Sequence, residues 1–149
     1  SKEANPELGG DKKKWYSDDE VSNLQVDAFR AGIKHNTEQF KKKLEANTDK
    51  AKNIAEQIYI HLYLALKVKT KEIKLRPTFI NSFDAIFIIP AKEYLSSERF
   101  DLIHKLSEKI LKENNSKDFN LSILFMPSSK KINEEALYAD GFHLTFGEK

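Results

Sequence analysis

The side chains best suited to chemistry are four histidines, which lie far apart in the sequence: His35, His61, His104 and His143. None pairs with another at the spacing that places two imidazoles on one helix face, as in the zinc motif His-Glu-x-x-His. Two of them, His61 and His104, fall on or beside apolar stripes, where a hydrogen-bonded histidine at the core edge is the simpler interpretation. Asp140 and His143 could approach each other, but two ligands do not make a metal site. We therefore predict neither a metal site nor a bound cofactor.

Nucleophilic catalysis has no recognisable setting either. The sequence contains no Gly-x-Ser-x-Gly elbow, and the serine pairs at 96–97 and 128–129 occupy cap or turn positions. Asp84 opens a buried strand, where a lone carboxylate more often caps a turn, here from Asn81, than catalyses. No two glycines beyond residue 10 lie close enough to form a phosphate-binding loop. The sequence indicates no reaction and favours a protein that is not an enzyme.

One pair of loops could still bind an anion. If two strands of the sheet run parallel, loops 91–97 and 127–133 leave the sheet at the same end, where ligands favour the crevice of open sheets. Two helix N-termini would lie beside these loops, and their free N–H groups suit phosphate or carboxylate. The competing interpretation makes the serines helix caps and the lysines solvated surface charges. The candidate anion-binding residues are Ser96, Ser97, Arg99, Ser128, Ser129, Lys130 and Lys131.

Charge is unevenly distributed along the chain. The net charge is +2, but residues 30–76 hold twelve basic and five acidic residues, a net of +7, which leaves −5 for the rest. Such a segment could attract phosphates, although lysines on helices mostly solvate an outer face. Residues 67–71 supply charge without the interleaved aromatic rings that base-stacking modules use. Weak, sequence-blind nucleic-acid binding through residues 30–76 is therefore the least favoured of our hypotheses.

The first half of the chain has a helical pattern behind a polar leader. Residues 1–16 are polar and glycine-bearing, and we expect a mobile leader there. Apolar residues between 40 and 65 recur at intervals of four and three, which predicts helical structure. One long helix or two would fit residues 17–66. We favour two antiparallel helices packed on the sheet, with the break near Gly32 or at Asn47-Thr48.

A strand–helix–strand unit is the firmest prediction for the second half. Phe83–Pro90 is nearly continuously apolar, and Phe119–Met126 has apolar residues on both faces, so both segments predict strands covered on two sides. The helical pattern from Ser97 to Asn114, capped by Ser96 or Ser97, joins them. Two strands joined in this way run parallel with a right-handed crossover.

Two more strands and a short helix complete the predicted sheet. Glu72–Ile80 contains Pro77, which cannot donate to a strand ladder, so we place this segment at an edge. Phe142–Phe146 forms a final strand, which we place at the other edge. Asn133 caps a short helix that runs through Ala139 and is stopped by Gly141 in the left-handed conformation.

Size and composition fit one globular domain. The chain has 149 residues, of which 40% are hydrophobic and 32% charged. We predict an α+β domain over residues 17–149: an N-terminal long helix or helical hairpin (17–66), then a small mixed sheet (70–149) with a strand–helix–strand crossover. No cysteine is present, and no apolar run reaches the roughly 20 residues of a membrane-spanning helix. We expect a cytoplasmic location; the alternative is an exported lipoprotein whose leader and lipidated residue precede this chain.

The helical segment is the strongest functional signal. Residues 58–66 are apolar nearly all round, so they are either sandwiched inside or shared with another chain. Aromatic residues at 15 and 16 add surface of the kind enriched where proteins meet. We therefore predict a non-catalytic protein-interaction module that uses the helical arm to bind a homodimer mate or another protein, with the anion site as the alternative. The candidate partner-binding residues are Trp15, Tyr16, Tyr59, Leu62, Tyr63 and Leu66.

Overall fold

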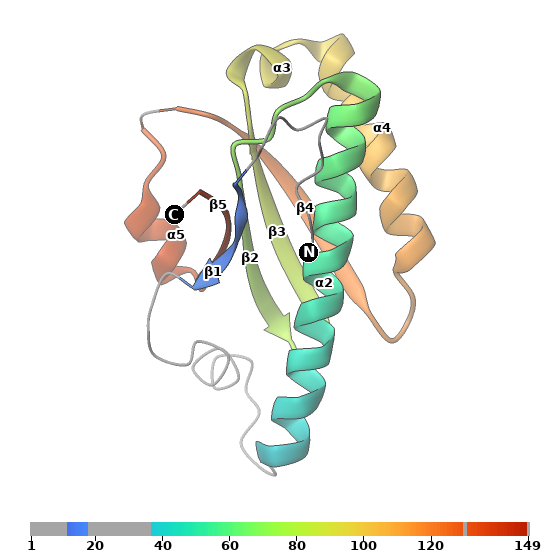
Figure 1. The fold of residues 1–149 in the computed structure, drawn as a ribbon, viewed down its shortest axis with the longest axis vertical. Coiled ribbons are helices and arrows are strands. Elements are labelled where there is room, and N and C mark those ends of the chain that lie inside the picture. The colour runs from blue at the N-terminus through green and yellow to red at the C-terminus, as the bar shows by residue number, and fades with distance from the viewer. Residues whose placement is uncertain (1–11, 18–36, 130, 149) are drawn as a thin grey trace.

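The computed structural model describes residues 12–17, 37–129 and 131–148. They form a five-stranded mixed sheet with long helices on one face and a short helix toward the other (Figure 1). The architecture is α+β, with a long helix ahead of a mixed sheet, as the sequence predicted. The described elements are β1 (Lys14–Ser17), α2 (Thr37–Leu66), β2 (Glu72–Phe79), β3 (Ser82–Ile89), α3 (Ala91–Leu95), α4 (Ser97–Asn114), β4 (Asn120–Pro127), α5 (Glu134–Ala139) and β5 (Leu144–Gly147).

Helix α2 is continuous over 30 residues. At the expected break, Thr48 Oγ1 donates a hydrogen bond to the Leu44 carbonyl (2.7 Å), which satisfies the hydroxyl without leaving the helix. The neighbouring Asn47 Nδ2 donates to the Ile80 carbonyl (3.0 Å) and ties the helix to the end of β2. The prediction of a break at Asn47-Thr48 was therefore wrong. The other proposed break, at Gly32, lies outside the described residues.

Helix α2 ends in a left-handed residue that is not glycine. Lys67 has φ of 60°, a conformation that costs a side-chain-bearing residue free energy. Its N–H donates to the Tyr63 carbonyl (2.9 Å), and the N–H of Val68 reaches back to the Leu62 carbonyl (3.1 Å). These bonds satisfy carbonyls of the last helical turn and direct the chain back toward β2.

The strand–helix–strand unit is confirmed. Strands β3 and β4 pair in parallel along their whole length, and α4 connects them. Ser96 caps α4, because its Oγ accepts a hydrogen bond from the Arg99 backbone N–H (3.1 Å). The helix buries an apolar stripe that includes Ile103, Ile110 and Leu111.

Helix α5 is closed at both ends as the sequence predicted. At its start, Asn133 Oδ1 accepts a hydrogen bond from the Ala136 N–H (2.9 Å). After its end, Gly141 has φ of 100°, in the region that favours glycine. The chain then enters β5.

The strand order differs from the prediction. The order is β1-β5-β2-β3-β4, so β2 and β5 are interior strands and β1 and β4 are the edges. Strand β2 accommodates Pro77 because β5 pairs only with Ile73–Leu75, so β3 is the sole neighbour at Pro77. The unpredicted edge is Lys14–Ser17, which pairs antiparallel with β5. Residues 14–16 thus belong to the sheet, whereas leader residues 1–11 lie outside the described part.

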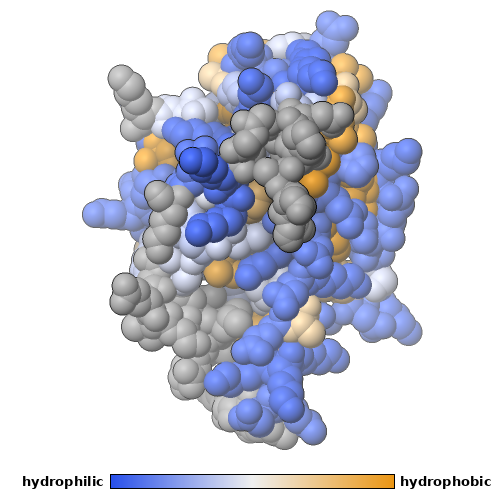
Figure 2. Space-filling view, in the orientation of Figure 1, coloured by the Kyte–Doolittle hydropathy of each residue, from blue (hydrophilic) through white to orange (hydrophobic). Residues whose placement is uncertain are grey.

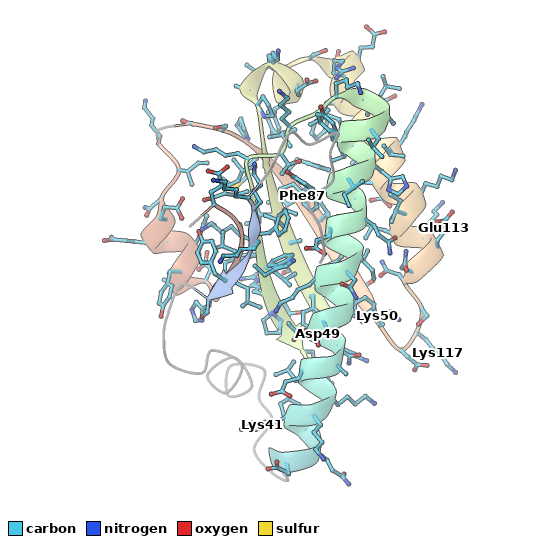
Figure 3. All side chains as sticks on the ribbon, in the orientation of Figure 1. Lys41, Asp49, Lys50, Phe87, Glu113 and Lys117 are labelled. Carbon is cyan, nitrogen blue, oxygen red and sulfur yellow. The ribbon has the colours of Figure 1, made fainter. Side chains whose placement is uncertain are left out.

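Alternation along the strands places the main core between the sheet and helices α2 and α4. Ile58 and Leu62 of α2 share one buried cluster with Phe87 and other residues of the sheet. In Figure 3, Phe87 is labelled on the sheet beside α2, and Lys41 lies near the N-terminal end of the helix, which extends past the sheet. Helix α2 is therefore part of the domain core rather than a projecting arm. No helix in the described ranges is long and apolar enough to cross a membrane.

Candidate functional site

The loops predicted to bind an anion leave the sheet at the same end, where the parallel strands β3 and β4 finish. Ile89 and Pro127, the last residues of the parallel strands, lie opposite each other. The polar groups of these loops, however, already serve the fold. Ser96 caps α4, Ser129 Oγ accepts a hydrogen bond from the Lys131 N–H (3.0 Å), and the Ser128 N–H donates to the Ile89 carbonyl (2.7 Å). Two other predicted residues add little, because Ser97 is an exposed helix residue and Lys130 lies outside the described residues.

Arg99 is the guanidinium among the candidate residues of these loops, and a buried carboxylate already neutralises its charge. Its Nε and Nη2 donate to the two carboxylate oxygens of Glu93 at 2.8 and 3.3 Å, and Nη2 also donates to the Leu66 carbonyl. Hydrogen bonding to Glu93 raises the pKa of Arg99 further above its ordinary value, so the guanidinium stays charged. Arg99 thus joins the end of α2 to α3 and α4. These contacts account for Ser96, Arg99 and Ser129 without an anion, and the Lys131 side chain is exposed.

The basic segment is divided between two environments. Lys67, Lys69 and Lys71 are exposed where α2 passes into β2. By contrast, the Lys74 side chain is buried, and its Nζ lies 3.0 Å from Glu134 Oε1 and 3.1 Å from Thr145 Oγ1. In the described part of the segment, Lys42, Lys43 and Lys50 are also exposed on α2, so the exposed lysines end before Lys74, which is paired with a carboxylate.

Asp84 has a structural partner in the next strand. Its Oδ2 accepts hydrogen bonds from Arg76 Nη2 (3.0 Å) and Nε (3.2 Å). The same guanidinium donates through Nη1 to the Asp140 carbonyl (2.6 Å) and lies 4.5 Å from the ring centre of Phe142. Arg76 and Asp84 neutralise each other, and the contacts of the guanidinium form a structural bridge between β2, β3 and the end of α5.

The described histidines and carboxylates do not assemble a metal centre. Within the described ranges, no three His, Asp or Glu side chains are placed to hold a metal ion. His61 Nδ1 lies 2.7 Å from the carbonyl one helical turn back, and His143 Nε2 lies 2.9 Å from the Tyr138 carbonyl. His104 lies 3.9 Å from Glu108 on the outside of α4. His35 lies outside the described residues.

The predicted partner-binding residues divide between core and surface. Tyr59 and Leu62 are buried, and the Tyr59 ring packs against Phe146 with 5.1 Å between ring centres. Trp15 packs against the same phenylalanine at 5.3 Å, which ties β1 to the core. The sheet of the same chain covers the apolar stripe of α2, so the burial of Tyr59 and Leu62 is explained without a partner. Tyr16, Tyr63 and Leu66 are half-buried.

Among the large apolar side chains of the described strands, Leu124 of β4 is the most exposed, ahead of Phe79 at the end of β2. Leu124 lies at the centre of this edge strand and is 60% exposed. Beside it, a groove of about 450 Å³ runs along the open face of the sheet. Met126 and Leu137 form apolar walls of the groove, and the Arg76–Asp84 pair lines another part of it. Strand β4 carries no charged side chain, although charges are a common protection of exposed edges.

Backbone groups in the middle of β4 point away from the sheet. The Asn120 N–H donates to the carbonyl of Asn81, just before β3 begins, so the odd-numbered residues of β4 direct their N–H and C=O groups outward. At one end, the Asn115 side-chain amide pairs with both backbone groups of Leu121, at 3.0 and 2.9 Å. At the other end, proline 127 has no N–H. The open edge is therefore formed by Ile123 and Phe125.

The sequence did not reveal this edge. The uncharged run in β4 predicted burial on both faces, because an interior strand and an unprotected edge strand have the same composition. No residue spacing in the sequence indicates that the Asn115 side chain pairs with the backbone of Leu121. Only the strand order, which depends on pairing between distant segments, distinguishes the two cases.

Known proteins give no guidance on function. No protein-family model, no curated protein sequence and no solved structure matches this chain.

Proposed function

We propose that this protein is a non-catalytic protein-interaction domain whose binding surface is the free edge of β4 and the open sheet face around Leu124. One observation carries the proposal: Leu124 is 60% exposed at the centre of an edge strand that has no charged residue. Uncharged edges with exposed apolar side chains invite pairing with another chain. A domain that keeps such an edge gains a binding surface at the risk of aggregation.

The charged groups of the described residues support a binding role over a catalytic one. Lys74, Arg76 and Arg99 are each paired with a carboxylate. Catalysis needs an acid, base or nucleophile that reaches a substrate with a suitable protonation state. Paired cations that bridge strands and helices instead rigidify the scaffold that presents the edge.

A second apolar surface competes with β4 for the partner. Leu95 is 77% exposed at the end of α3, and Leu102 is 42% exposed on α4. Figure 2 shows hydrophobic atoms gathered beside α3 and α4, whereas the lower part of α2 is hydrophilic. Single exposed leucines on helices are common and need no partner. We prefer β4 because its surface combines an apolar side chain with backbone donors and acceptors.

Site-specific photocrosslinking tests the proposal. A benzoylphenylalanine at Leu124, expressed in the source organism, is expected to give one discrete crosslinked protein. The same residue at Glu98, an exposed position on α4, is the matched control and is expected to give none. Adding Ser122→Glu on the same sheet face is expected to abolish the band, since a charge beside Leu124 opposes apolar contact. A band at Leu95 with none at Leu124 would move the binding surface to the helices and refute the proposal for β4.

A further inference from the structure

We infer that the β4 edge binds an extended peptide segment of the partner, which joins the five described strands as a sixth and places one apolar side chain beside Leu124. The inference rests on the proposed function and names the partner's chemistry. Its basis is the backbone of β4, whose outward N–H and C=O groups repeat at the spacing that another extended backbone matches.

The open part of the edge has a defined length. Ile123 and Phe125 are two residues apart, the spacing at which one strand offers successive pairs of groups to its neighbour. Asn115 already occupies the groups of Leu121, and Pro127 offers only a carbonyl. The incoming strand can therefore make continuous ladder bonds only over a short stretch, about three to five residues at the repeat of a strand.

Side chains on the open face indicate an apolar contact from the peptide. A residue opposite Leu124 would lie next to the groove, where Met126 provides apolar surface. The charged residues at the groove, Arg76 and Asp84, neutralise each other at 3.0 Å. An apolar peptide residue beside Leu124 therefore gains van der Waals contact. A charged residue there would lose its hydration without gaining an opposite charge.

The other face of the incoming strand would meet α4. Phe100 of α4 packs against Phe125 of β4 with ring centres 5.8 Å apart, so this helix lies over the edge strand. His104, one turn further along α4, lies 6.3 Å from the Phe100 ring. A peptide strand beside β4 would thus find aromatic surface above it as well as backbone groups along its length.

The position of α4 argues against a second copy of this chain as the occupant. In Figure 1, α4 is the outermost helix on the β4 side of the sheet. Two β4 strands paired edge to edge would lie about 4.8 Å apart. Packed helices need about 8–10 Å between their axes, so two α4 helices would collide above such a pair. A bare extended segment has no helix to collide, and it fits the edge.

Backbone N-methylation of a probe peptide provides a direct test. The probes are acetylated and amidated heptapeptides of alternating valine and threonine with terminal lysines. The central residue is leucine in one peptide and glutamate in another. The leucine peptide is expected to bind, and nuclear magnetic resonance titration is expected to shift the amides of Ile123 and Phe125 first. The glutamate peptide is expected to bind at least about tenfold more weakly, because a desolvated charge without a partner is costly.

N-methylation at each peptide position in turn gives the decisive pattern. Methylation at positions whose N–H faces β4 is expected to weaken binding about threefold to tenfold per lost hydrogen bond. Methylation at the alternate positions removes an outward N–H and serves as the matched control, with little effect. A protein variant, Ile123→Pro, removes an outward donor while sparing the bonds to β3, and is expected to weaken binding to the same degree.

Three results would overturn strand addition. The first is a series of N-methylated peptides whose affinity does not depend on the position of the methyl group. The second is no binding by any probe at millimolar concentration. The third is a dimer in light scattering that Ile123→Pro converts to monomer, since this would assign the edge to a second copy. If the Leu124 crosslink forms but affinity does not depend on the position of N-methylation, the interaction function stands and only strand addition is rejected. If no crosslinked protein forms at Leu124, the proposed function is rejected, whatever the probe peptides do.

Discussion

Replacing Phe87 with alanine tests the position of the main core. Phe87 lies in β3, between β2 and β4 in the sheet, and its side chain is fully buried beside α2. Its ring centre lies 5.7 Å from that of Phe125, its partner in the strand register. The substitution removes most of an aromatic ring from a site that surrounding strands prevent from collapsing.

The expected cost follows from the burial of the ring. Deleting a fully buried phenylalanine side chain typically lowers the free energy of unfolding by about 3–5 kcal/mol, which includes the cavity that remains. For a domain near 150 residues this corresponds to a melting temperature lowered by about 6–20 °C. The matched control is Leu124→Ala, also in the paired strands but 60% exposed, for which we expect a change within about 1 kcal/mol.

Urea unfolding measured by two probes is the appropriate assay. Circular dichroism follows the helices, and fluorescence follows Trp15, the single tryptophan, which packs 5.3 Å from Phe146. Coincident transitions would show that β1, α2 and the sheet unfold as one unit. A loss below about 1 kcal/mol for Phe87→Ala, or a loss equal to that of Leu124→Ala, would refute the assignment of the core.

Three other substitutions or measurements test local features. Lys67→Gly is expected to raise the free energy of unfolding by about 0.5–1 kcal/mol, because glycine adopts the observed φ of 60° without strain. Gly141→Val is expected to lower it by more than about 1 kcal/mol, because Gly141 has φ of 100°. Gly147→Ala is the control, since its added Cβ would meet the flexible Glu72 side chain at 3.2 Å and the Thr145 methyl group at an ordinary 3.6 Å. Duplex DNA is expected not to be retained in a filter assay at physiological salt, because Lys74 and Arg76 are paired with carboxylates and leave the release of counterions to exposed lysines of the basic segment such as Lys69.

Each of these expectations has a contrary outcome. Destabilisation by Lys67→Gly would mean that the lysine side chain, 5.1 Å from the Tyr63 ring centre, contributes more than the strain costs. Equal effects of the substitutions at 141 and 147 would remove the argument from positive φ. Tight DNA retention with a steep salt dependence would restore the nucleic-acid hypothesis.

The features that the sequence determined correctly depend on neighbouring residues. The helix cap at Ser96, the cap at Asn133 and the left-handed Gly141 each follow from a few consecutive residues and their backbone preferences. The parallel crossover is also nearly local, because a helix between two buried strands leaves little choice of direction or handedness. The α+β class follows from the change of apolar period between the two halves of the chain.

The helix break was an error of local interpretation that tertiary contacts corrected. Asn47 and Thr48 have low helix propensity, which favoured a break. In the folded chain, Thr48 bonds back to its own helix and Asn47 bonds to the end of β2. A hydrogen bond to a residue 33 positions away therefore offsets the low helix propensity of Asn47, which the sequence alone shows.

The strand order, and with it the proposed binding edge, was decided only by the tertiary structure. Lys14–Ser17 pairs with β5 at the other end of the chain, which makes β5 an interior strand. Strands β2, β5 and β1 follow one another on the far side of β3, so β4 is left at the edge. Apolar alternation fixes which face of a strand is buried, but it does not state whether a neighbour exists on each side. Hydrogen-bonding edges are unmarked in the sequence because every residue except proline carries the same backbone groups. Exposure of Leu124 could therefore be known only once all the strands were paired.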